Sequence, residues 1–288
     1  MIVYKNQDQT ILKGIVVKVL ENGAFVDIGE KKLAFLPLAQ MPKNNFQSVN
    51  DLISVNQQIE VMIFNTYENE ITLTMFNRKY SSIFDEIFDY QVNTVENIIL
   101  NCKDSKKNQI VFFGDSLFEF FDVKKYLPQF HIYNNALAGA TTELLLYLQS
   151  YSVKRYDPKA VFVLIGTNDL CDLKKVPQYE SLLNIRCLLD MFKKQKIKNI
   201  YILSVLPINE NIQSDKNKSN AKLIDFKSKV ENIVLEYGGA FEFIDIYDKM
   251  LDNKNQLREE FTTDGLHLSE EGYIELSRNL KPYLSKLN

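Results

Sequence analysis

From residue 110 onward, short apolar runs alternate with segments of helical periodicity, and this alternation constrains the fold more than any other feature of the chain. Because the runs are apolar at nearly every position, both of their faces must be buried. A parallel sheet covered by helices on both sides meets that requirement, so the sequence predicts a three-layer α/β domain. The runs cover residues 110–113, 131–133, 161–165, 200–205 and 241–246, and helical patterns follow the first three at 118–126, 142–148 and 181–194.

The first quarter of the chain follows a different pattern, in which short strands alternate apolar and polar residues between turn signals. Asn22-Gly23 separates two such strands, and this dipeptide favours a type I′ hairpin turn because both central residues need positive φ. Glu68-Asn69 separates a second pair. Five short strands of this kind predict a small closed all-β barrel. The expected strands are residues 15–19, 24–28, 33–36, 59–64 and 71–76.

Residues 80–100 connect the two patterns and have the periodicity of an amphipathic helix. Ser82 and Asp85 resemble a capping box at its start. Residues 101–109 are polar and lack periodicity, which is typical of a linker. The apolar stripe of the expected helix consists of Phe84, Phe88, Val92, Val95 and Ile99. The expected organisation is a barrel domain at residues 1–78, a connecting helix and linker at 79–107, and an α/β domain at 108–288.

Composition and charge exclude several classes of protein. The 288 residues are 45% hydrophobic, which is enough to fill two cores, and a formal net charge of −3 gives no general attraction to nucleic acid or to an anionic membrane. The chain has neither an uninterrupted run of about 18 apolar residues nor the pattern of a secretory leader, so we expect a cytoplasmic protein without a membrane span. Its three widely spaced cysteines, Cys102, Cys171 and Cys187, fit reduced thiols better than disulfides or a zinc site.

Four short motifs stand at the ends of these predicted elements. They are Gly-Asp-Ser-Leu at 114–117, the Gly139 that closes Asn-Asn-Ala-Leu-Ala-Gly, Gly-Thr-Asn-Asp at 166–169 and Asp-Gly-Leu-His at 264–267. The first three follow predicted strands, and the carboxyl ends of parallel strands meet at one edge of a sheet. The fourth precedes a helix that Ser269 is suited to cap. The sequence therefore predicts that all four motifs meet at one edge.

The ordered motifs resemble those of the SGNH, or GDSL, hydrolase superfamily over roughly residues 108–288. Ser116, Gly139, Asn168 and His267 match its four signature positions. The resemblance implies a flavodoxin-like three-layer fold and a serine esterase without metal or organic cofactor.

The roles expected of these residues follow from the chemistry of acyl transfer. Ser116 is the nucleophile, His267 takes its proton and returns it to the leaving alcohol, and Asp264 orients the imidazole. The backbone N–H groups of Ser116 and Gly139 and the side-chain amide of Asn168 are expected to form the oxyanion hole.

Two further polar residues receive structural interpretations. Asp115 is expected to order the loop before the nucleophile, and His131 is expected to lie in the core or at an edge of the sheet. The chain has no Gly-x-Ser-x-Gly or His-Glu-x-x-His motif, which disfavours the α/β-hydrolase fold and common zinc peptidases.

The barrel segment, about residues 8–78, resembles the S1-type RNA-binding domain, which is an OB-fold. The match lies in Lys13-Gly14-Ile15-Val16, in the seven residues from Gly23 to Gly29 and in Ala34-Phe35-Leu36-Pro37. The resemblance implies that Phe25 and Phe35 stack on bases and that Lys18, Lys31 and Lys32 lie near the nucleic-acid backbone.

Alternative interpretations of the barrel stay open at this point. A Phe in an alternating barrel strand is more often a core residue than a stacking platform. Residues 1–78 carry 7 basic and 8 acidic side chains, which is not the excess of a strongly basic domain. RNA, a protein partner or the C-terminal domain are therefore the three candidate ligands of the barrel.

Within the superfamily, the segments 138–142, 204–209 and 264–269 look most like the platelet-activating-factor acetylhydrolase-like branch, which implies short acyl groups such as acetyl. Ala136, Ala138 and Ala140 depart from the Gly, Gly and Asp that relatives often carry, and these departures put the shape of the acyl pocket in doubt. The leading hypothesis is an esterase for small, metabolite- or polymer-linked acyl esters, with RNA as a candidate partner. The alternatives are an RNA-binding regulator with a scaffold hydrolase domain, or a lysophospholipase, thioesterase or acyltransferase.

Overall fold

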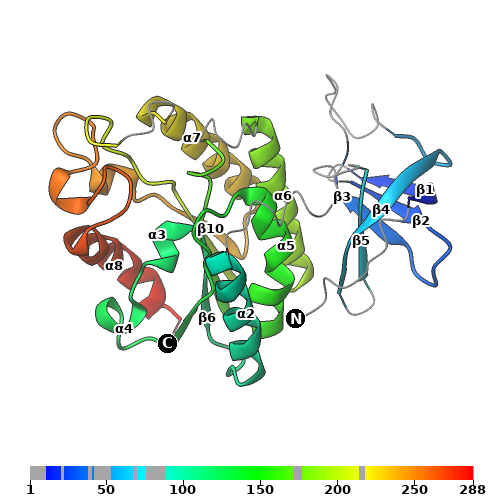
Figure 1. The fold of residues 1–288 in the computed structure, drawn as a ribbon, viewed down its shortest axis with the longest axis horizontal. Helices are drawn as coiled ribbons and strands as arrows, with labels where there is room; N and C mark the ends of the chain where they lie inside the picture. The colour runs from blue at the N-terminus through cyan, green and yellow to red at the C-terminus, as the bar shows by residue number, and fades with distance from the viewer. Residues whose placement is uncertain are drawn as a thin grey trace. The chain divides into compact units, whose positions relative to one another are not determined.

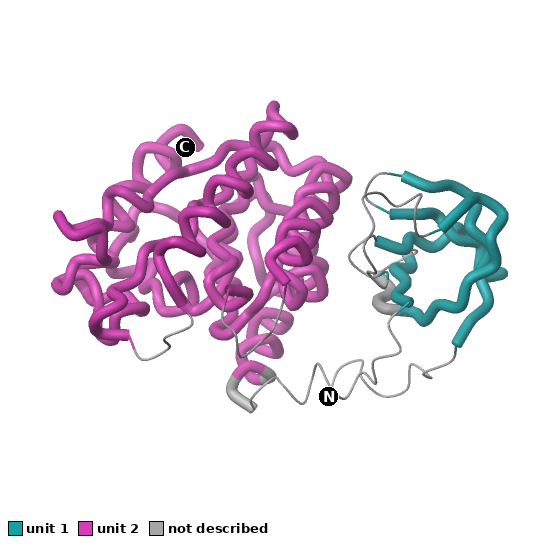
Figure 2. The backbone as a smooth tube through the Cα atoms, turned by 90° about the horizontal axis from the view of Figure 1, so that it is seen from above, with its two compact units in different colours: residues 1–89 teal, residues 90–288 magenta. Residues whose placement is uncertain are grey.

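The computed structural model of the chain describes residues 11–20, 23–37, 41, 53–67, 70–75, 89–170, 177–213 and 218–287. The chain divides into two compact units, residues 1–89 and residues 90–288, which Figure 2 colours separately. Each unit is described by itself below.

The first unit is a closed five-stranded barrel with strand order β1-β2-β3-β5-β4. Its strands are β1 (Leu12–Leu20), β2 (Gly23–Asp27), β3 (Ala34–Pro37), β4 (Gln58–Tyr67) and β5 (Glu70–Thr74). The neighbouring strands are antiparallel except β3 and β5, whose parallel pairing of Phe35 with Thr72 closes the barrel. The predicted barrel and its five strands are confirmed, while the turn residues Asn22 and Glu68-Asn69 lie outside the described residues.

The side chains of β1 follow the alternation that defines a half-buried strand. Gly14 and Val16 are buried, whereas Lys13, Ile15 and Val17 are exposed. The pairing of β1 with β2 shifts by one residue between Val16 and Lys18, as in a β-bulge. The barrel core is apolar and includes Val16, Ala24, Val26, Leu36, Val61 and Leu73.

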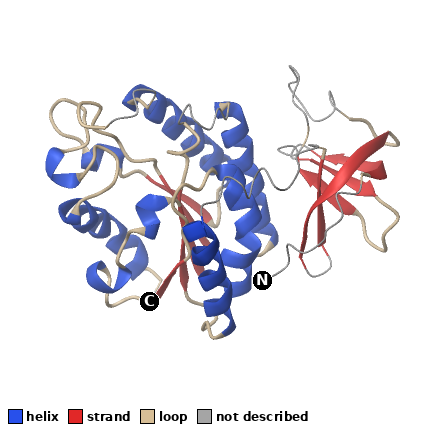
Figure 3. Ribbon diagram, viewed as in Figure 1, coloured by secondary structure: helices blue, strands red, loops and turns tan. Residues whose placement is uncertain are grey.

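The second unit is built on a five-stranded parallel sheet of order β10-β9-β8-β6-β7 (Figure 3). Its strands are β6 (Ile110–Gly114), β7 (Ile132–Asn134), β8 (Ala160–Leu164), β9 (Asn199–Leu203) and β10 (Phe241–Ile244). Every residue of the central strands β6 and β8 is buried, which confirms the expectation drawn from their uninterrupted apolar character. His131 directly precedes the edge strand β7 and is exposed.

Helices cover both faces of this sheet and give the predicted three-layer α/β architecture. Figure 1 shows α5 and α6 on one side and α3, α4 and α8 on the other. On the α8 side, Phe112, Phe162 and Tyr201 from three adjacent strands lie in successive ring contact. The helices are α2 (Asp89–Lys103), α3 (Ser116–Glu119), α4 (Val123–Tyr126), α5 (Thr142–Ser152), α6 (Gln178–Lys194), α7 (Asn220–Tyr237) and α8 (Glu270–Ser285).

The helix boundaries differ from the sequence expectations in three places. The connecting helix α2 continues to Lys103, beyond the expected end, while its expected start, with Ser82, lies outside the described residues. The helix expected at 118–126 is two short helices, because Asp122 caps α4 by accepting the Lys125 N–H at 3.0 Å. Helix α7 was not predicted, although the N-cap Ser219 was a signal for it.

Candidate active site

Ser116 lies at the first position of α3, two residues after the end of β6. Asp115 caps this short helix, and its carboxyl group accepts the Leu117 N–H at 3.0 Å. Gly114 is required where β6 passes β8, because a Cβ there would lie 2.1 Å from the Leu164 carbonyl oxygen. The Gly-Asp-Ser sequence therefore forms a tight strand-to-helix turn with Ser116 at the carboxyl edge of the sheet.

Three of the residues that the motifs predicted come together in a chain of hydrogen bonds. Ser116 Oγ lies 3.1 Å from His267 Nε2, and His267 Nδ1 lies 2.7 Å from Asp264 Oδ2. Since a carboxylate can only accept, this contact assigns the proton of the neutral imidazole to Nδ1 and leaves Nε2 as the acceptor for the Ser116 hydroxyl. An arrangement of this kind can take a proton from a hydroxyl that attacks an electrophile.

The Asp264 carboxylate is held by the backbone of its own loop. Its Oδ1 accepts the N–H of Leu266 at 2.9 Å and the N–H of His267 at 2.7 Å. Burial by itself would raise the pKa of Asp264, but the hydrogen bonds from the His267 ring and from these two N–H groups lower it below its usual value. The carboxylate is therefore charged at neutral pH and can stabilise an imidazolium.

The loop that carries Asp264 and His267 is closed by hydrogen bonds within a few residues. Thr262 and Leu268 form an isolated antiparallel bridge. The Thr262 hydroxyl donates to the His267 carbonyl at 2.8 Å and accepts the Gly265 N–H at 2.8 Å. These contacts fix the backbone conformation of the segment that carries the His267 imidazole and the Asp264 carboxylate.

The loop that ends at Gly139 continues from β7 along the edge of β6. The Asn135 N–H donates to the Phe112 carbonyl at 2.8 Å, and the Leu137 N–H donates to the Gly114 carbonyl at 2.9 Å. The loop is therefore attached to the strand that leads into the Ser116 turn.

The three predicted oxyanion donors belong to this same edge. The Ser116 N–H is in the first turn of α3, where N–H groups have no partner within the helix. Gly139 has a φ of 75°, which side-chain-bearing residues rarely adopt. Asn168 Nδ2 donates to the Ala140 carbonyl at 2.9 Å, so this amide lies against the Gly139 loop. The arrangement can offer N–H donors from two loops and a helix terminus.

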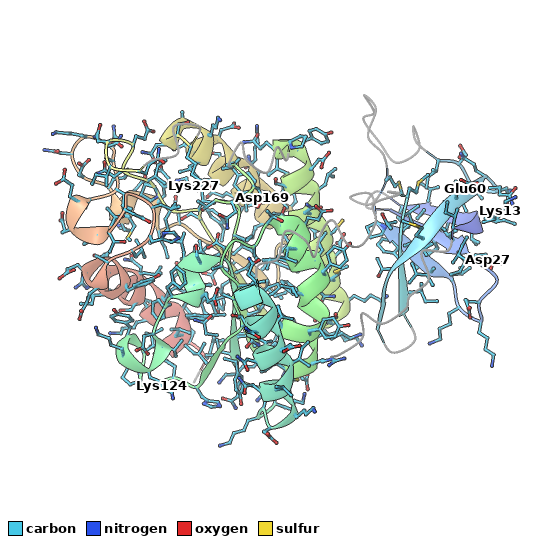
Figure 4. The ribbon with its side chains drawn as sticks, in the orientation of Figure 1. Lys13, Asp27, Glu60, Lys124, Asp169 and Lys227 are labelled. Carbon is cyan, nitrogen blue, oxygen red and sulfur yellow. The ribbon has the colours of Figure 1, made fainter. Side chains whose placement is uncertain are left out.

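Two buried carboxyl groups adjoin these residues in the sequence. Burial raises the pKa of Asp115 to about 7 and that of Asp169 to about 6. Asp169, which is labelled in Figure 4, accepts the Thr142 N–H at 3.1 and 3.0 Å and also the Thr142 hydroxyl, so it attaches the Asn168 loop to the start of α5. The structure agrees with the ordering role expected of Asp115. Asp169 was not singled out from the sequence, although its place directly after Asn168 was a signal.

Phe120 is a second residue that sequence reasoning missed. Its ring centroid lies 5.5 Å from that of His267, with the planes tilted by 52°. The residue is 51% exposed, so an apolar aromatic surface adjoins the imidazole.

The residues predicted to contact RNA lie on the surface of the barrel. Phe25 and Phe35 are directly opposite each other on β2 and β3, and their ring centroids are 5.4 Å apart. Both are half-buried, so neither is a core residue. Lys18 is exposed and lies opposite Phe25 on β1, whereas Lys31 and Lys32 are exposed in the β2–β3 connection. The register brings Phe25, Phe35 and Lys18 together, and nothing observed joins the two other lysines to them.

Two other kinds of functional feature are absent from the described residues. In that part of the chain no group of three or more His, Cys, Asp or Glu side chains is arranged to hold a metal ion. None of the helices described is both long and apolar enough for a bilayer crossing. Cys102 and Cys187 take part in no disulfide, and Cys171 lies outside the described residues.

A three-layer α/β fold with this constellation at the carboxyl edge of its sheet defines the class of hydrolases that act on esters. The chain belongs to the GDSL-like lipase/acylhydrolase family, whose model matches residues 112–273, more than half of its length. The model of the S1 RNA-binding domain matches residues 5–74, which include the barrel strands. Both resemblances seen in the sequence are thereby confirmed.

Part of the chain is similar in sequence to two other proteins. One is the N-acylneuraminate cytidylyltransferase of Escherichia coli O18:K1:H7, which is 28% identical over 186 residues, or 60% of this chain. The other is an uncharacterized protein of Mycoplasma pneumoniae, which is 29% identical over 174 residues, or 52% of this chain. The chain spans 39% of the length of the first and 19% of the second, so the similarity concerns one part of each.

Solved structures extend the comparison to the fold. A candidate platelet activating factor from Streptococcus pneumonia is 29% identical, with a TM-score of 0.62, and the match covers 72% of this chain and 100% of that one. A candidate acylhydrolase from Bacteroides fragilis is 18% identical, with a TM-score of 0.60 and coverage of 67% and 97%. A GDSL-like lipase from Bacteroides thetaiotaomicron is 19% identical, with a TM-score of 0.60 and coverage of 67% and 98%. The two Bacteroides proteins share the fold.

Proposed function

We propose that the second unit is a serine esterase that hydrolyses small O-acyl esters, acetyl esters foremost. The observation that carries this proposal is the hydrogen-bonded chain from Ser116 Oγ to His267 Nε2, at 3.1 Å, and from His267 Nδ1 to Asp264 Oδ2, at 2.7 Å. Membership of the GDSL-like lipase/acylhydrolase family supports ester chemistry at this site.

The geometry suggests the following sequence of proton transfers. Ser116 Oγ attacks the acyl carbonyl carbon while His267 Nε2 takes its proton, and Asp264 stabilises the resulting imidazolium. The tetrahedral oxyanion accepts hydrogen bonds from the N–H groups of Ser116 and Gly139 and from the Asn168 amide. When the C–O bond to the leaving group breaks, His267 returns the proton to the alcohol. Water then attacks the acyl-enzyme with the same assistance, which releases the acid and restores Ser116.

The preference for a short acyl group has separate support. The segments 138–142, 204–209 and 264–269 resemble the platelet-activating-factor acetylhydrolase-like branch apart from the departures at Ala138 and Ala140, and the similar Streptococcus structure carries a related description. The triad itself fixes neither the leaving group nor the acceptor, so lysophospholipase, thioesterase and acyltransferase activities are the alternatives within the same machinery.

The test is a chain-length series of p-nitrophenyl acetate, butyrate and octanoate with wild type, Ser116→Ala and the control Ser277→Ala. Ser277 is a buried serine on α8 that donates to the Ile274 carbonyl, outside the proposed site. We expect activity that favours acetate, is lost in Ser116→Ala and persists in Ser277→Ala. Full activity of Ser116→Ala would overturn the proposal, and a preference for octanoate would replace the small-acyl substrate with a lipid one.

A second candidate function is RNA binding by the barrel, which would recruit an acylated, RNA-linked substrate. The paired, half-buried rings of Phe25 and Phe35 with the exposed Lys18 beside them support it, together with the match to the S1 model. Fluorescence anisotropy of a labelled single-stranded RNA tests it at low and high salt. Binding that weakens with salt is expected, and no binding at low salt would remove this function.

The competing hypothesis is an RNA-binding regulator whose second unit serves only as a scaffold. The intact Ser116, His267 and Asp264 arrangement argues against it, because a scaffold has no need of a nucleophile, a base and an orienting carboxylate in hydrogen-bond contact. Tight RNA binding combined with no turnover of any ester in the series would favour it.

A further inference from the structure

Two side chains form hydrogen bonds with the backbone of Ala138, the residue before Gly139. The Ala138 N–H donates to the carboxylate of Glu119, at the end of α3. The Ala138 carbonyl accepts a hydrogen bond from Gln91 Nε2 at 2.5 Å. Gln91 belongs to α2 and is 4% exposed, so this contact is shielded from water.

Gln91 also lies close to Gly139 itself. A Cβ at Gly139 would lie 3.0 Å from Gln91 Nε2, and the φ of 75° at Gly139 disfavours any side chain there. The glutamine amide therefore packs against the residue whose N–H is the proposed oxyanion donor. A glycine at this position makes the loop compact, but it also gives the backbone freedom to adopt other conformations.

The orientation of the Gly139 N–H follows from the planarity of the peptide. In a trans peptide the C=O and the following N–H point in opposite directions, so a partner that fixes the Ala138 carbonyl also fixes the direction of the Gly139 N–H. No hydrogen bond from this N–H is found within the described part of the chain, which leaves it available as a donor. Without the Gln91 contact, rotation of this peptide could turn the N–H away from the reacting carbonyl.

The second side chain links the same loop to both neighbouring helices. Glu119 accepts a hydrogen bond from the Thr94 hydroxyl of α2 at 3.3 Å, in addition to the Ala138 N–H. Helix α2, helix α3 and the Gly139 loop thus share one set of polar contacts. Helix α2 lies outside the matched segment 112–273, so the family model does not include Gln91.

We propose that Gln91 is a positioning residue that holds the Ala138–Gly139 peptide with its N–H directed at the oxyanion, and that Glu119 assists by holding the Ala138 N–H. This inference rests on the proposed esterase function. It assigns to the connecting helix a direct part in the geometry of the active site.

Two substitutions and one matched control test the proposal in the full chain. Gln91→Met keeps the length of the side chain but removes its donor, and Gln91→Glu keeps its shape and polarity. The control is Gln149→Met, which removes another buried glutamine; it lies on α5, and its Oε1 accepts a hydrogen bond from Gln195 at the C-terminal end of α6. The readouts are kcat and KM for p-nitrophenyl acetate and the thermal unfolding temperature.

We expect Gln91→Met to lower kcat by about 10- to 100-fold with little change in KM, because misplacement of a reacting group affects the transition state more than substrate binding. A deprotonated carboxyl cannot donate, whereas a protonated one can. The kcat of Gln91→Glu relative to wild type should therefore rise as the pH falls through the pKa of the introduced carboxyl. A purely structural role for Gln91 would give no such recovery.

The outcomes separate this inference from the function on which it rests. If wild type hydrolyses the ester and both Gln91 variants stay within twofold of it, the positioning role is wrong and the esterase stands. If Gln149→Met loses as much kcat as Gln91→Met, the effect is general destabilisation and the inference fails. If Gln91→Met does not fold, Gln91→Glu decides through its pH profile. If wild type hydrolyses no ester, both proposals fall together.

Discussion

The barrel and the α/β unit differ in where they keep their polar side chains. Among the barrel residues whose burial is described, Thr74 is the only buried polar one, and the aromatic pair Phe25 and Phe35 lies partly exposed. The α/β unit instead buries hydroxyl, amide and carboxyl groups, Ser116 and Asp169 among them, at and near the carboxyl edge of its sheet. Exposed rings suit stacking on a ligand, whereas buried polar groups held by hydrogen bonds suit proton transfer.

Several of the polar groups buried in the second unit are joined in a connected set of hydrogen bonds. The Asn184 amide donates to the Thr142 hydroxyl at 3.0 Å, and that hydroxyl donates to Asp169. Such sets stabilise one conformation of the loops at the edge, because a buried group left without a partner costs about 1–3 kcal/mol. The barrel relies on apolar packing and has less need of them. Changes in one unit should therefore leave the function of the other intact.

The largest expected effect is that of Asp264→Asn on catalysis. The amide removes the charge that stabilises the imidazolium and favours the wrong tautomer of His267, which lowers kcat by about 10⁴-fold in a serine protease. Ester turnover should fall by a similar factor, while RNA affinity stays the same. A parallel loss of RNA binding would break the separation of the two units, and a fall in kcat of less than tenfold would contradict the role of Asp264.

Asn168→Ala should have the next largest effect. Loss of one oxyanion donor lowers kcat by about 10²- to 10³-fold, with a smaller change in KM. Steady-state kinetics with p-nitrophenyl acetate measure the effect, and Asn279→Ala at a half-buried position of α8 is the control. If instead KM rose by a similar factor while kcat stayed constant, Asn168 would contribute to binding of the substrate and not to stabilising the transition state.

Phe25→Ala sharpens the comparison from the side of the barrel. A stacked base contributes about 1–3 kcal/mol, so RNA affinity should fall by about 5- to 150-fold. Ester turnover should not change. Ile15→Ala removes a 50% exposed apolar residue on β1 and serves as the control. Equal affinity of Phe25→Ala and wild type, measured by anisotropy, would show that the aromatic pair is not a stacking platform.

The smallest expected effect concerns the pH dependence of stability. Burial raises the pKa of Asp115 to about 7, so between about pH 4 and about pH 7 the folded unit holds a proton that the unfolded chain has released. Raising the pH through this range therefore destabilises the fold. Asp115→Asn keeps a capping side chain but removes this titration. The fall in unfolding temperature between about pH 4 and about pH 7 should therefore be smaller in the variant, by about 2–4 °C for each kcal/mol of pH-dependent stability that is removed.

Thermal unfolding followed at a series of pH values checks this prediction. The comparison is between the slopes of wild type and Asp115→Asn over the same range. An unchanged slope would mean that other groups, such as Asp169 with its pKa of about 6, account for the whole dependence.

Sequence reasoning was most successful where a pattern of residues is compatible with only one kind of local structure. A run such as residues 161–165 can only be buried on both faces, and Gly114 before Asp115 allows a tight turn after such a run. These features predicted the sheet and brought Ser116, Asp264 and His267 to one edge. Alternation did not decide that Phe25 is half-buried, because period two gives the face of a strand but not whether that face is covered.

Other contacts could not be read from the chain because they depend on tertiary packing. The pattern of α2 drew attention to its apolar stripe, while Gln91 contacts the Ala138 carbonyl, 47 residues away. No spacing rule links those two positions. The break before α4 was readable in principle, since Asp122 is a good N-cap, but the apolar residues around it favoured a single helix.

The short bridge between Thr262 and Leu268 encloses both His267, the proposed base, and its carboxylate partner Asp264, so the two are positioned relative to each other by one local segment. Both side chains and the hydrogen bonds that shape them lie within seven residues, and the Asn209 N–H, which donates to the Gly265 carbonyl at 2.8 Å, attaches this segment to the rest of the unit. The distance between Ser116 Oγ and His267 Nε2 is then the one separation in the proposed triad that joins residues far apart in the sequence. Substitutions between Ser116 and Asp264 should therefore be tolerated only where they preserve this separation, the buried core and the proposed oxyanion donors Gly139 and Asn168.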